Sequence, residues 1–523
     1  MWFHHKDVLI SPFDEGYYTK HGLTALIGEA DKWIPLSKAD NTNLSSTSEN
    51  IIVVGEDRIQ AVNKSEECMF SIYWEGPKQA VRESLWFLLF TNADLHPATS
   101  LSMNSKEQIC SYVPLPQIWQ SCIEAKFQES LEWIDSPSSE GIERIVPLDR
   151  PFNSLLLSFN AETKDIFLIA DEEAKQRYRL IRGSEQLLTI KSLAVQVRED
   201  KSCEVEHLVL AVHGIGQKFA GKMGHSFIED VDSFRNSIKS ISVAKGISAG
   251  KVSVLPVCWR TGTALFERDD FEDILQKITL QSVPLFRSLI SDAALDILLY
   301  MSTRHCDRIQ SFIINEIIRL VLLFRQHNPG FAGKVHVLAH SLGSALIADV
   351  LSCQNQLQEH SIKLGIIFTL GSPASLFGLL KEEAAIQPCA DVALYNIYHP
   401  TDPIAYRMEP LVLRERPELL EPAVPIPSSS SLLANMVKKV TSKVSERFLG
   451  VKTSQAACTN PSPSVMTNPL YRYNPRGRVD YCLQQGFFET DYIASLRAHF
   501  CYWHDRDVAS FVLNEVYSSI YST

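Results

Sequence analysis

Short apolar runs alternate with helical patterns from about residue 200 onward, and this alternation limits the possible folds more than any other feature of the chain. The runs cover residues 207–212, 252–257, 335–339, 365–370 and 392–397. Strands buried on both faces read as continuous apolar runs, and helical connections between strands favour parallel pairing. We therefore predict a doubly wound, mostly parallel α/β domain over residues 201–523.

The first 200 residues have a different pattern. Residues 69–74 form a β-rich run that ends at the turn signal Gly76-Pro77, and apolar side chains recur every three or four positions from Pro114 to Ile134. The first pattern is typical of a strand and the second of an amphipathic helix. We predict a mixed, β-rich N-terminal domain over residues 1–200 that serves for packing; a substrate-gating or membrane-facing role is the alternative.

A Pro- and Ser-rich stretch interrupts the α/β pattern at about residues 417–470. We interpret it as a flexible insertion within the domain. Inside it, residues 431–450 place apolar side chains at helical spacing on one side and Lys and Arg on the other. This pattern predicts a basic amphipathic helix at the surface of an anionic membrane, or alternatively a helix that packs on the domain.

Composition excludes several classes of protein. The 523 residues carry 50 Lys and Arg against 61 Asp and Glu, a net charge of -11, which argues against nucleic acid as a partner. No uncharged apolar run approaches the 18 residues of a bilayer-spanning helix. The 11 cysteines are odd in number and contain no CxxC pair, and residues 1–7 do not form a signal peptide, so we predict reduced thiols in a cytoplasmic protein.

The third apolar run leads directly into the sequence Ala339-His340-Ser341-Leu342-Gly343, and a helical pattern follows. A strand, a sharp turn at serine and a helix form the nucleophile elbow of α/β-hydrolases, in which small residues two positions before and after the serine permit close packing. Ala339 replaces the usual first glycine. We predict that Ser341 is a nucleophile in an α/β-hydrolase domain; the alternative is a serine that caps the following helix.

A serine nucleophile needs a base and an acid that orients the base, and in this fold they follow in the order serine, acid, histidine. Asp402 follows the fifth apolar run, at the edge where catalytic groups of parallel sheets gather. His499 follows the segment 479–483, a plausible last strand. We therefore predict Asp402 as the acid and His499 as the base, with Asp480 as the alternative acid and His504 as the alternative base.

The oxyanion of an acyl-transfer reaction needs backbone amides as donors. One donor should be Leu342, which follows the nucleophile, and the other should lie in the loop His213-Gly214-Ile215-Gly216 after the first apolar run. Gly214 and Gly216 permit the backbone angles that turn amides toward a substrate. We predict Ile215 as the second donor. The same loop lacks the complete spacing of a phosphate-binding loop.

Beyond these residues, the sequence resembles the DDHD-domain phospholipases, which are similar to the intracellular phosphatidic-acid-preferring phospholipase A1. The resemblance spans most of the chain, and its short form is similar to the fungal and plant branch. The matching stretches are residues 73–77, 208–217, 255–260, 296–300, 340–344, 371–373, 399–407, 478–481 and 499–503. The resemblance implies hydrolysis of the first ester of a glycerophospholipid on a membrane by a cytosolic protein. We predict a cytoplasmic, peripherally membrane-associated enzyme that needs no cofactor.

The four residues that name this family would fall on Asp402, Asp480, His499 and Asp507. Our prediction is that they bind no metal, and a divalent cation held by this set is the alternative. Arginine binds phosphate with two parallel hydrogen bonds, so Arg407 and Arg478 are candidate ligands of the head group. The alternative is that these arginines form structural salt bridges, for example with Glu409.

Two other functions fit the same residues. One is a carboxylesterase or neutral-lipid lipase that uses the same serine. The other is a metal-binding, lipid-binding adaptor of membrane traffic with little catalysis. Head-group preference and oligomeric state are not fixed by the sequence.

Overall fold

The computed structural model divides the chain into two compact units, Met1–Ser202 and Cys203–Thr523, which we describe separately. It describes residues 1–6, 15–91, 94, 109–134, 143–152, 154–171, 176–193, 197, 204–214, 226–248, 251–259, 297, 300–351, 354–381, 391–427, 468–484 and 498–518.

The first unit contains two six-stranded antiparallel sheets. The order of the first sheet is β2 (Trp33–Pro35), β1 (Trp2–His5), β6 (Gln79–Glu83), β5 (Cys68–Ser71), β4 (Gln60–Asn63) and β3 (Ile51–Val54). The order of the second sheet is β8 (Ile109–Pro114), β7 (Trp86–Thr91), β12 (Gln176–Arg182), β11 (Ile166–Asp171), β10 (Leu156–Asn160) and β9 (Glu143–Pro147). The prediction of a β-rich N-terminal region is confirmed.

Helices accompany both sheets of this unit. They are α1 (Glu15–Ile27), α2 (Lys38–Ser46), α4 (Gln117–Ile134), α5 (Ser184–Thr189) and the 3₁₀ turn η3 (Lys191–Leu193). Helix α4 lies within the range predicted from its apolar spacing, and it buries Trp119 and Ile123 completely.

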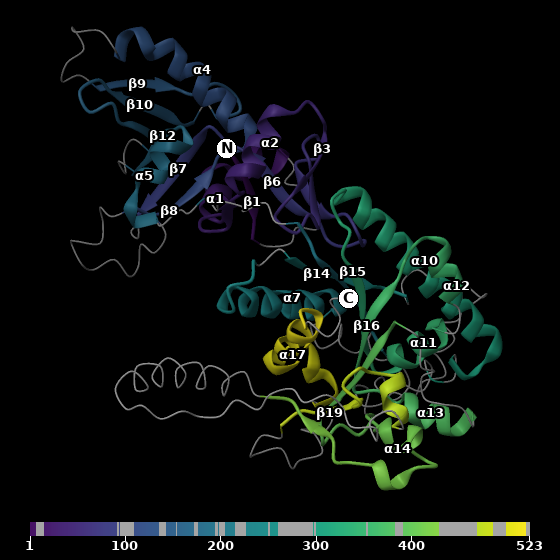
Figure 1. Ribbon diagram of the computed structural model, residues 1–523. Helices are drawn as coiled ribbons and strands as arrows, with labels where there is room; N and C mark the ends of the chain where they lie inside the picture. Colours follow the sequence, from purple (N-terminus) through teal and green to yellow (C-terminus); the bar gives the residue numbers. More distant parts are fainter. Residues whose placement is uncertain are drawn as a thin grey trace, which may run out of the picture. The chain divides into compact units, whose positions relative to one another are not determined.

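The second unit is built on a seven-stranded sheet in which every strand pair is parallel (Figure 1). Its order is β14 (Val252–Val257), β13 (His207–Val212), β15 (Lys334–His340), β16 (Leu364–Leu370), β17 (Ala393–Tyr398), β19 (Asp480–Cys482) and β18 (Val424–Pro425). All six residues of β14 are buried, which explains why its sequence is apolar apart from Ser253. The prediction of a mostly parallel α/β sheet is confirmed.

Helices flank both faces of this sheet (Figure 1). Helices α7 (Phe227–Ala244) and α17 (Arg506–Val516) pack together over one face, where they share a core with side chains of β16 and β17 such as Phe368 and Tyr395. On the other side, α10 (Thr303–His327), α11 (Leu342–Leu351), α12 (Gln354–Glu359) and α13 (Ala374–Lys381) pack against one another. Short elements complete the unit: α14 (Glu409–Val412), η5 (Pro417–Leu419), η7 (Pro469–Arg472) and η8 (Cys501–Trp503).

Part of the predicted insertion takes part in this sheet. Strand β18 and the turn η5 fall inside the range 417–470, and β18 pairs with β19 at the sheet edge. Residues 428–467 lie outside the described residues, and so does the amphipathic helix predicted at residues 431–450.

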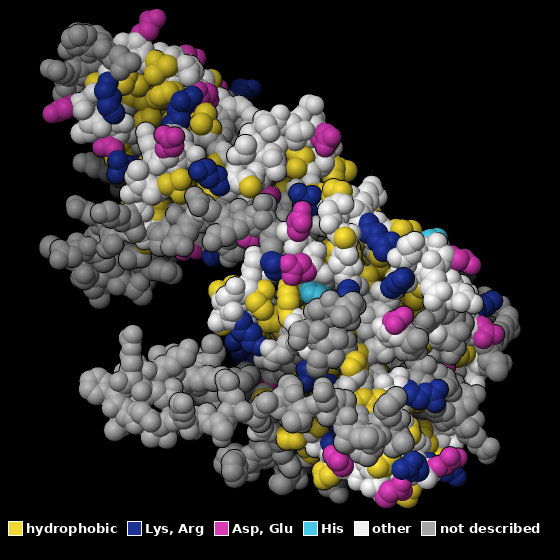
Figure 2. Space-filling view, in the orientation of Figure 1, with side chains coloured by type: hydrophobic (Ala, Val, Ile, Leu, Met, Phe, Trp, Pro, Cys, Tyr) yellow, Lys and Arg dark blue, Asp and Glu magenta, His cyan; other side chains and the backbone are white. Residues whose placement is uncertain are grey.

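Within the described part of the chain, no helix combines the length and the apolar character that a bilayer crossing demands. On the face shown in Figure 2, basic and acidic side chains are interspersed.

Three histidines of the second unit make its stability sensitive to acid. Burial lowers the pKa of His207 to about 4, and the pKa values of His336 and His340 to about 3. The unfolded chain, with histidine pKa values near ~6.5, binds protons below that pH that the folded chain does not bind, so the free energy of unfolding falls as the pH falls from about 6.5 toward 4. Each independent histidine contributes at most about 1.4 kcal/mol per pH unit.

We expect urea unfolding at pH 7.0 and 5.5 to show this loss of stability. His336→Gln should reduce the pH dependence, whereas His360→Gln should not, because His360 is exposed. An equal pH dependence in the His336 variant and the wild type would show that another group carries it.

Candidate active site

Ser341 lies in a sharp turn between β15 and α11. Its backbone φ is +53°, a left-handed conformation that costs a non-glycine residue about 1–3 kcal/mol. Its amide donates to the Leu370 carbonyl of the neighbouring strand at 2.9 Å. This strand–turn–helix geometry is that of a nucleophile elbow.

Two glycines permit the close packing around this turn. A Cβ atom at Gly343 would lie 2.5 Å from the His213 carbonyl oxygen, and one at Gly214 would lie 2.4 Å from the Ser341 Cβ. Both distances are below any normal contact, so the approach of α11 and of the loop after β13 to the serine requires glycine at these two positions.

The structure brings together the three side chains predicted as nucleophile, base and acid. His499 Nε2 lies 2.9 Å from Ser341 Oγ, and His499 Nδ1 lies 3.0 Å from both carboxylate oxygens of Asp402. The exposed fractions of Ser341, His499 and Asp402 are 0%, 5% and 6%, so all three lie in a low-dielectric interior. The hydrogen bonds have the order and distances of a Ser–His–Asp triad.

Asp402 is held as an anion by its surroundings. Burial by itself would raise its pKa, but the hydrogen bonds with His499, Tyr502 and the Ile404 amide outweigh burial, and the pKa of Asp402 is lowered. The Tyr502 hydroxyl donates at 2.7 Å to Oδ2, and the Ile404 amide donates at 2.9 Å to Oδ1. An ionised Asp402 favours the tautomer of His499 that carries its proton on Nδ1, which leaves Nε2 free to accept the Ser341 proton.

Two residues of this arrangement were not predicted from the sequence as site residues. Tyr502 also accepts a 2.9 Å hydrogen bond from the His399 amide, which fixes its hydroxyl beside Asp402. Gly371 has φ of +56°, and a Cβ there would lie 2.6 Å from Asp402 Oδ2 and 3.2 Å from His499 Nδ1. A side chain at this position would therefore collide with the Asp402–His499 pair.

His340, which precedes the serine, supports the base from behind. Its Nε2 lies 2.7 Å from the His499 carbonyl oxygen. Because burial keeps this imidazole neutral at pH 7, it fixes the backbone of His499 without adding a charge beside the base.

The predicted oxyanion donors are only partly described. Leu342 is the first residue of α11, where helical amides have no partner within the helix. His213 and Gly214 are buried, and the Trp259 indole both donates to the His213 carbonyl at 3.0 Å and stacks on its ring. Ile215 and Gly216 lie outside the described residues.

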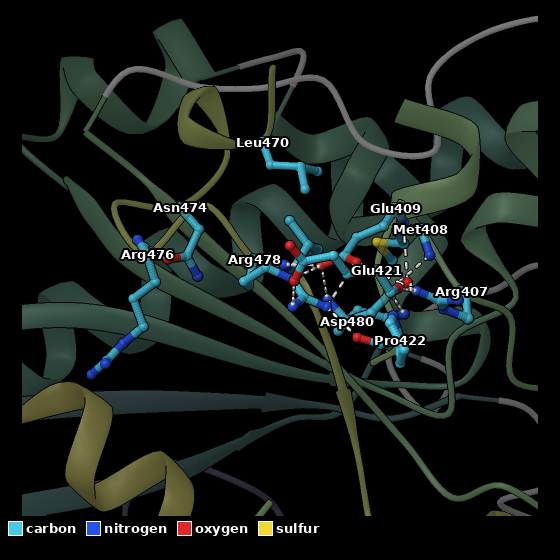
Figure 3. A network of polar contacts seen from close by, with 12 residues as sticks. Arg407, Met408, Glu409, Glu421, Pro422, Leu470, Asn474, Arg476, Arg478 and Asp480 are labelled. Atoms are coloured by element: carbon cyan, nitrogen blue, oxygen red, sulfur yellow. Dashed lines mark hydrogen bonds and ion pairs between the residues drawn. The ribbon is translucent and has the colours of Figure 1, made fainter. Parts of the chain in front are cut away.

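Arg407 and Arg478, the candidate head-group ligands, are engaged with carboxylates (Figure 3). Arg407 Nε lies 3.0 Å from Asp480 Oδ2, whereas Arg478 contacts Glu409 at 3.1 Å and Glu421 at 2.8 Å. These are the structural salt bridges considered as the alternative, and Glu409 is a member of the network.

The carboxylates of this network also accept backbone amides from each other's segments. Asp480 accepts the amides of Met408 at 2.9 Å and Glu409 at 3.2 Å, while Glu409 accepts those of Val479 at 2.7 Å and Asp480 at 3.0 Å. Both carboxylates are fully buried. This exchange ties the segment that follows the Asp402 loop to β19.

The remaining candidates lie in other settings. His504, the alternative base, is exposed and contacts Ser233 and Asp230 of α7 at 2.8 and 3.0 Å. Asp507 lies in the first turn of α17, which Asp505 caps. Among the described residues, no three His, Cys, Asp or Glu side chains are grouped as metal ligands would be.

The fold and the site thus define a parallel α/β protein in which a serine, a histidine and an aspartate are joined by hydrogen bonds at the carboxyl edge of the sheet. The DDHD domain matches residues 362–468 and 452–517. Residues 362–517 therefore match a DDHD domain, and the resemblance inferred from the sequence is confirmed over this part of the chain.

Curated relatives agree with this assignment. A probable mitochondrial phospholipase of Saccharomyces cerevisiae is 30% identical over 368 residues, which are 62% of this chain and 51% of the relative. A probable mitochondrial phospholipase of Schizosaccharomyces pombe is 26% identical, over 71% of this chain and 61% of the relative. A triacylglycerol hydrolase of Mus musculus is 21% identical, over 94% of this chain and 92% of the relative. The chain thus spans between half and two thirds of the two yeast relatives.

The predicted cytoplasmic location is wrong. Both yeast relatives are named as mitochondrial proteins. The prediction rested on reduced cysteines, which argue against an oxidising compartment but do not distinguish the cytosol from other reducing compartments.

Proposed function

We propose that this protein is a lipid hydrolase that cleaves an acyl ester of a glycerophospholipid through Ser341. The observation that carries the proposal is the continuous line of hydrogen bonds from Ser341 through His499 to Asp402, in a domain whose relatives are named phospholipases and a triacylglycerol hydrolase. The proposal includes a Ser–His–Asp mechanism, a preference for the first ester as in a phospholipase A1, and action at a membrane surface.

In the proposed mechanism, Ser341 Oγ attacks the ester carbonyl carbon while His499 Nε2 takes the hydroxyl proton. The imidazolium that forms is stabilised by the ionised Asp402. The Leu342 amide, with Ile215 as the second donor, stabilises the oxyanion of the tetrahedral intermediate. His499 then protonates the leaving lysolipid oxygen, which leaves an acyl group on Ser341. Water that gives its proton to His499 attacks this acyl group and releases the fatty acid.

Burial of the site bears on how a lipid reaches it. Ser341 is completely buried, so the ester reaches its hydroxyl only when the surface over it opens. A water-poor site also strengthens the electrostatic terms on which the mechanism depends.

The test is lipid mass spectrometry of the purified protein with separate vesicles or emulsions of phosphatidic acid, phosphatidylcholine and triacylglycerol, beside a soluble short-chain ester. We expect a free fatty acid and a 2-acyl lysophospholipid from a phospholipid. Release of diacylglycerol from triacylglycerol alone would favour the neutral-lipid alternative, for which the name of the mouse relative speaks. No product from any of the four substrates would contradict ester hydrolysis.

A further inference from the structure

A pocket of about 790 Å³ lies at the amino ends of the parallel strands, at the edge of the sheet opposite to Ser341. It is lined by the first residues of β15, β16 and β17 and by residues 471–475, which form the end of η7 and the chain just after it. The segment 471–475 is fixed to β17, because the Tyr473 carbonyl accepts the Leu394 amide at 2.8 Å and the Asn474 side chain donates to the Leu394 carbonyl at 3.0 Å. The pocket wall is therefore anchored to the sheet.

Most charged side chains that line this pocket are basic. Among the described residues that line it, Arg325, Lys334, Lys363 and Arg472 are basic and Asp391 is the single acid. Lys363 and Arg472 are exposed and form no ion pair with a described residue. This excess of positive charge favours an anionic ligand.

Two hydrogen bonds fix the Arg325 side chain at the pocket. Its guanidinium donates to the carbonyls of His360 at 3.1 Å and Ser361 at 2.9 Å. A guanidinium whose charge is not neutralised by these carbonyls still contributes its field to the pocket.

A buried histidine supplies the second observation that points to a ligand. His336 lines the pocket and is only 1% exposed, and its Nδ1 atom has no hydrogen-bond partner. Its Nε2 lies 3.0 Å from His207 Nδ1. When His207 donates in this contact, the neutral His336 ring carries its remaining proton on Nδ1, where it is available to an acceptor.

Gly365 keeps side-chain atoms away from that buried nitrogen. Gly365 also lines the pocket, and a Cβ atom there would lie 3.3 Å from His336 Nδ1. A side chain at this position would press against the imidazole ring, so glycine leaves this edge of His336 without a side chain over it.

We propose that this pocket binds the phosphate group of a phosphorylated ligand, with Lys363 and Arg472 neutralising its charge and His336 Nδ1 donating a hydrogen bond to it. The volume falls in the range of small-molecule sites, about 300–1,000 Å³. Ser341 lies at the other end of β15, seven residues beyond Lys334 and so about 20 Å away at the rise of a β-strand. The site is thus distinct from the ester-cleaving site.

The test is equilibrium dialysis of the full chain with inorganic phosphate as the probe. We expect saturable binding that weakens at least tenfold in Lys363→Glu with Arg472→Glu. Lys38→Glu with Arg414→Glu changes the net charge equally at two exposed positions outside the pocket and should bind as the wild type does. Absence of saturable binding, or equal weakening in both double variants, would overturn the proposal.

Gly365→Ala tests the pocket without any change of charge. Its φ is not in the left-handed region, so alanine is compatible with the backbone, and the methyl group would occupy the space beside His336 Nδ1. We expect weaker phosphate binding with a thermal melting curve close to that of the wild type. Undiminished binding in a folded Gly365→Ala protein would contradict the assignment of His336.

Two further experiments distinguish a soluble phosphate ester from a lipid head group as the ligand. Glycerol 3-phosphate is tested as a competitor of inorganic phosphate, and sedimentation with phosphatidic-acid vesicles is compared between the wild type and the Lys363→Glu, Arg472→Glu variant. Competition with unchanged sedimentation identifies a soluble phosphate ester, whereas a loss of sedimentation identifies a lipid head group. If glycerol 3-phosphate does not compete and sedimentation does not change, phosphorylated ligands are excluded.

Discussion

Ser341→Ala is expected to abolish ester hydrolysis, with a loss of roughly a million-fold, because the serine, histidine and aspartate of such a site act as a unit. The change removes one oxygen atom, the one that lies 2.9 Å from His499 Nε2. The fold should remain, since alanine leaves the backbone turn and its hydrogen bond to Leu370 unchanged. Release of fatty acid and labelling by a fluorophosphonate probe measure the effect, and both should disappear together.

The matched control is Ser253→Ala, which also removes a buried hydroxyl. Ser253 lies near the amino end of β14, and its hydroxyl has no hydrogen-bond partner. This variant should keep its activity and its labelling. Turnover or labelling that persists in the Ser341 variant would remove Ser341 as the nucleophile.

Asp402→Asn should lower kcat by about ten-thousand-fold, the size of the effect in serine proteases. An asparagine amide beside His499 Nδ1 favours the tautomer whose proton is on Nε2, and that tautomer cannot accept a proton from Ser341. The hydrogen bond from Tyr502 would remain with the asparagine oxygen, so the protein should stay folded. Steady-state kinetics with a soluble ester measures kcat separately from binding to a lipid surface.

Asp507→Asn is the comparison for this prediction. Asp507 lies in the first turn of α17, where a negative charge is worth about 0.3–1 kcal/mol through the helix dipole. We expect its activity to stay within about tenfold of the wild type. Equal losses in the two variants, or activity that vanishes with EDTA and returns with one specific cation, would count for a metal-dependent mechanism.

The parallel sheet could be predicted because burial leaves a direct mark on its strands. The runs 207–212 and 252–257 coincide with β13 and β14, since strands covered on both faces have few polar residues to break the pattern. Strand β18 could not be predicted in this way, because it has only two residues and one is Pro425. Similarly, the run from residue 81 to 89 does not show that Ser84 and Leu85 divide it between β6 and β7, which belong to two different sheets.

Some residues of the candidate site could be predicted from the sequence and others could not. Chain order and sheet edges were enough to select Ser341, Asp402 and His499, which the structure brings within hydrogen-bond distance, while their catalytic roles stay predictions. Tyr502 and Gly371 could not be selected, because each matters only through atoms that are distant in sequence and meet it after folding.

Asp480 and Glu409 each accept backbone amides from the other's segment, so Asp480 has a structural setting that differs from that of Asp402 and His499. The carboxylate oxygens of Asp480 accept hydrogen bonds from Asn396, Arg407 and two backbone amides. His499 contacts Ser341 instead, and Asp402 contacts the other nitrogen of the His499 ring. Residues that form one motif in the sequence therefore have different surroundings in the structure. Asp402 and His499 belong to the proposed catalytic triad, whereas Asp480 holds backbone segments together. Loss of Asp480 should therefore destabilise the sheet edge without removing a proposed reacting group.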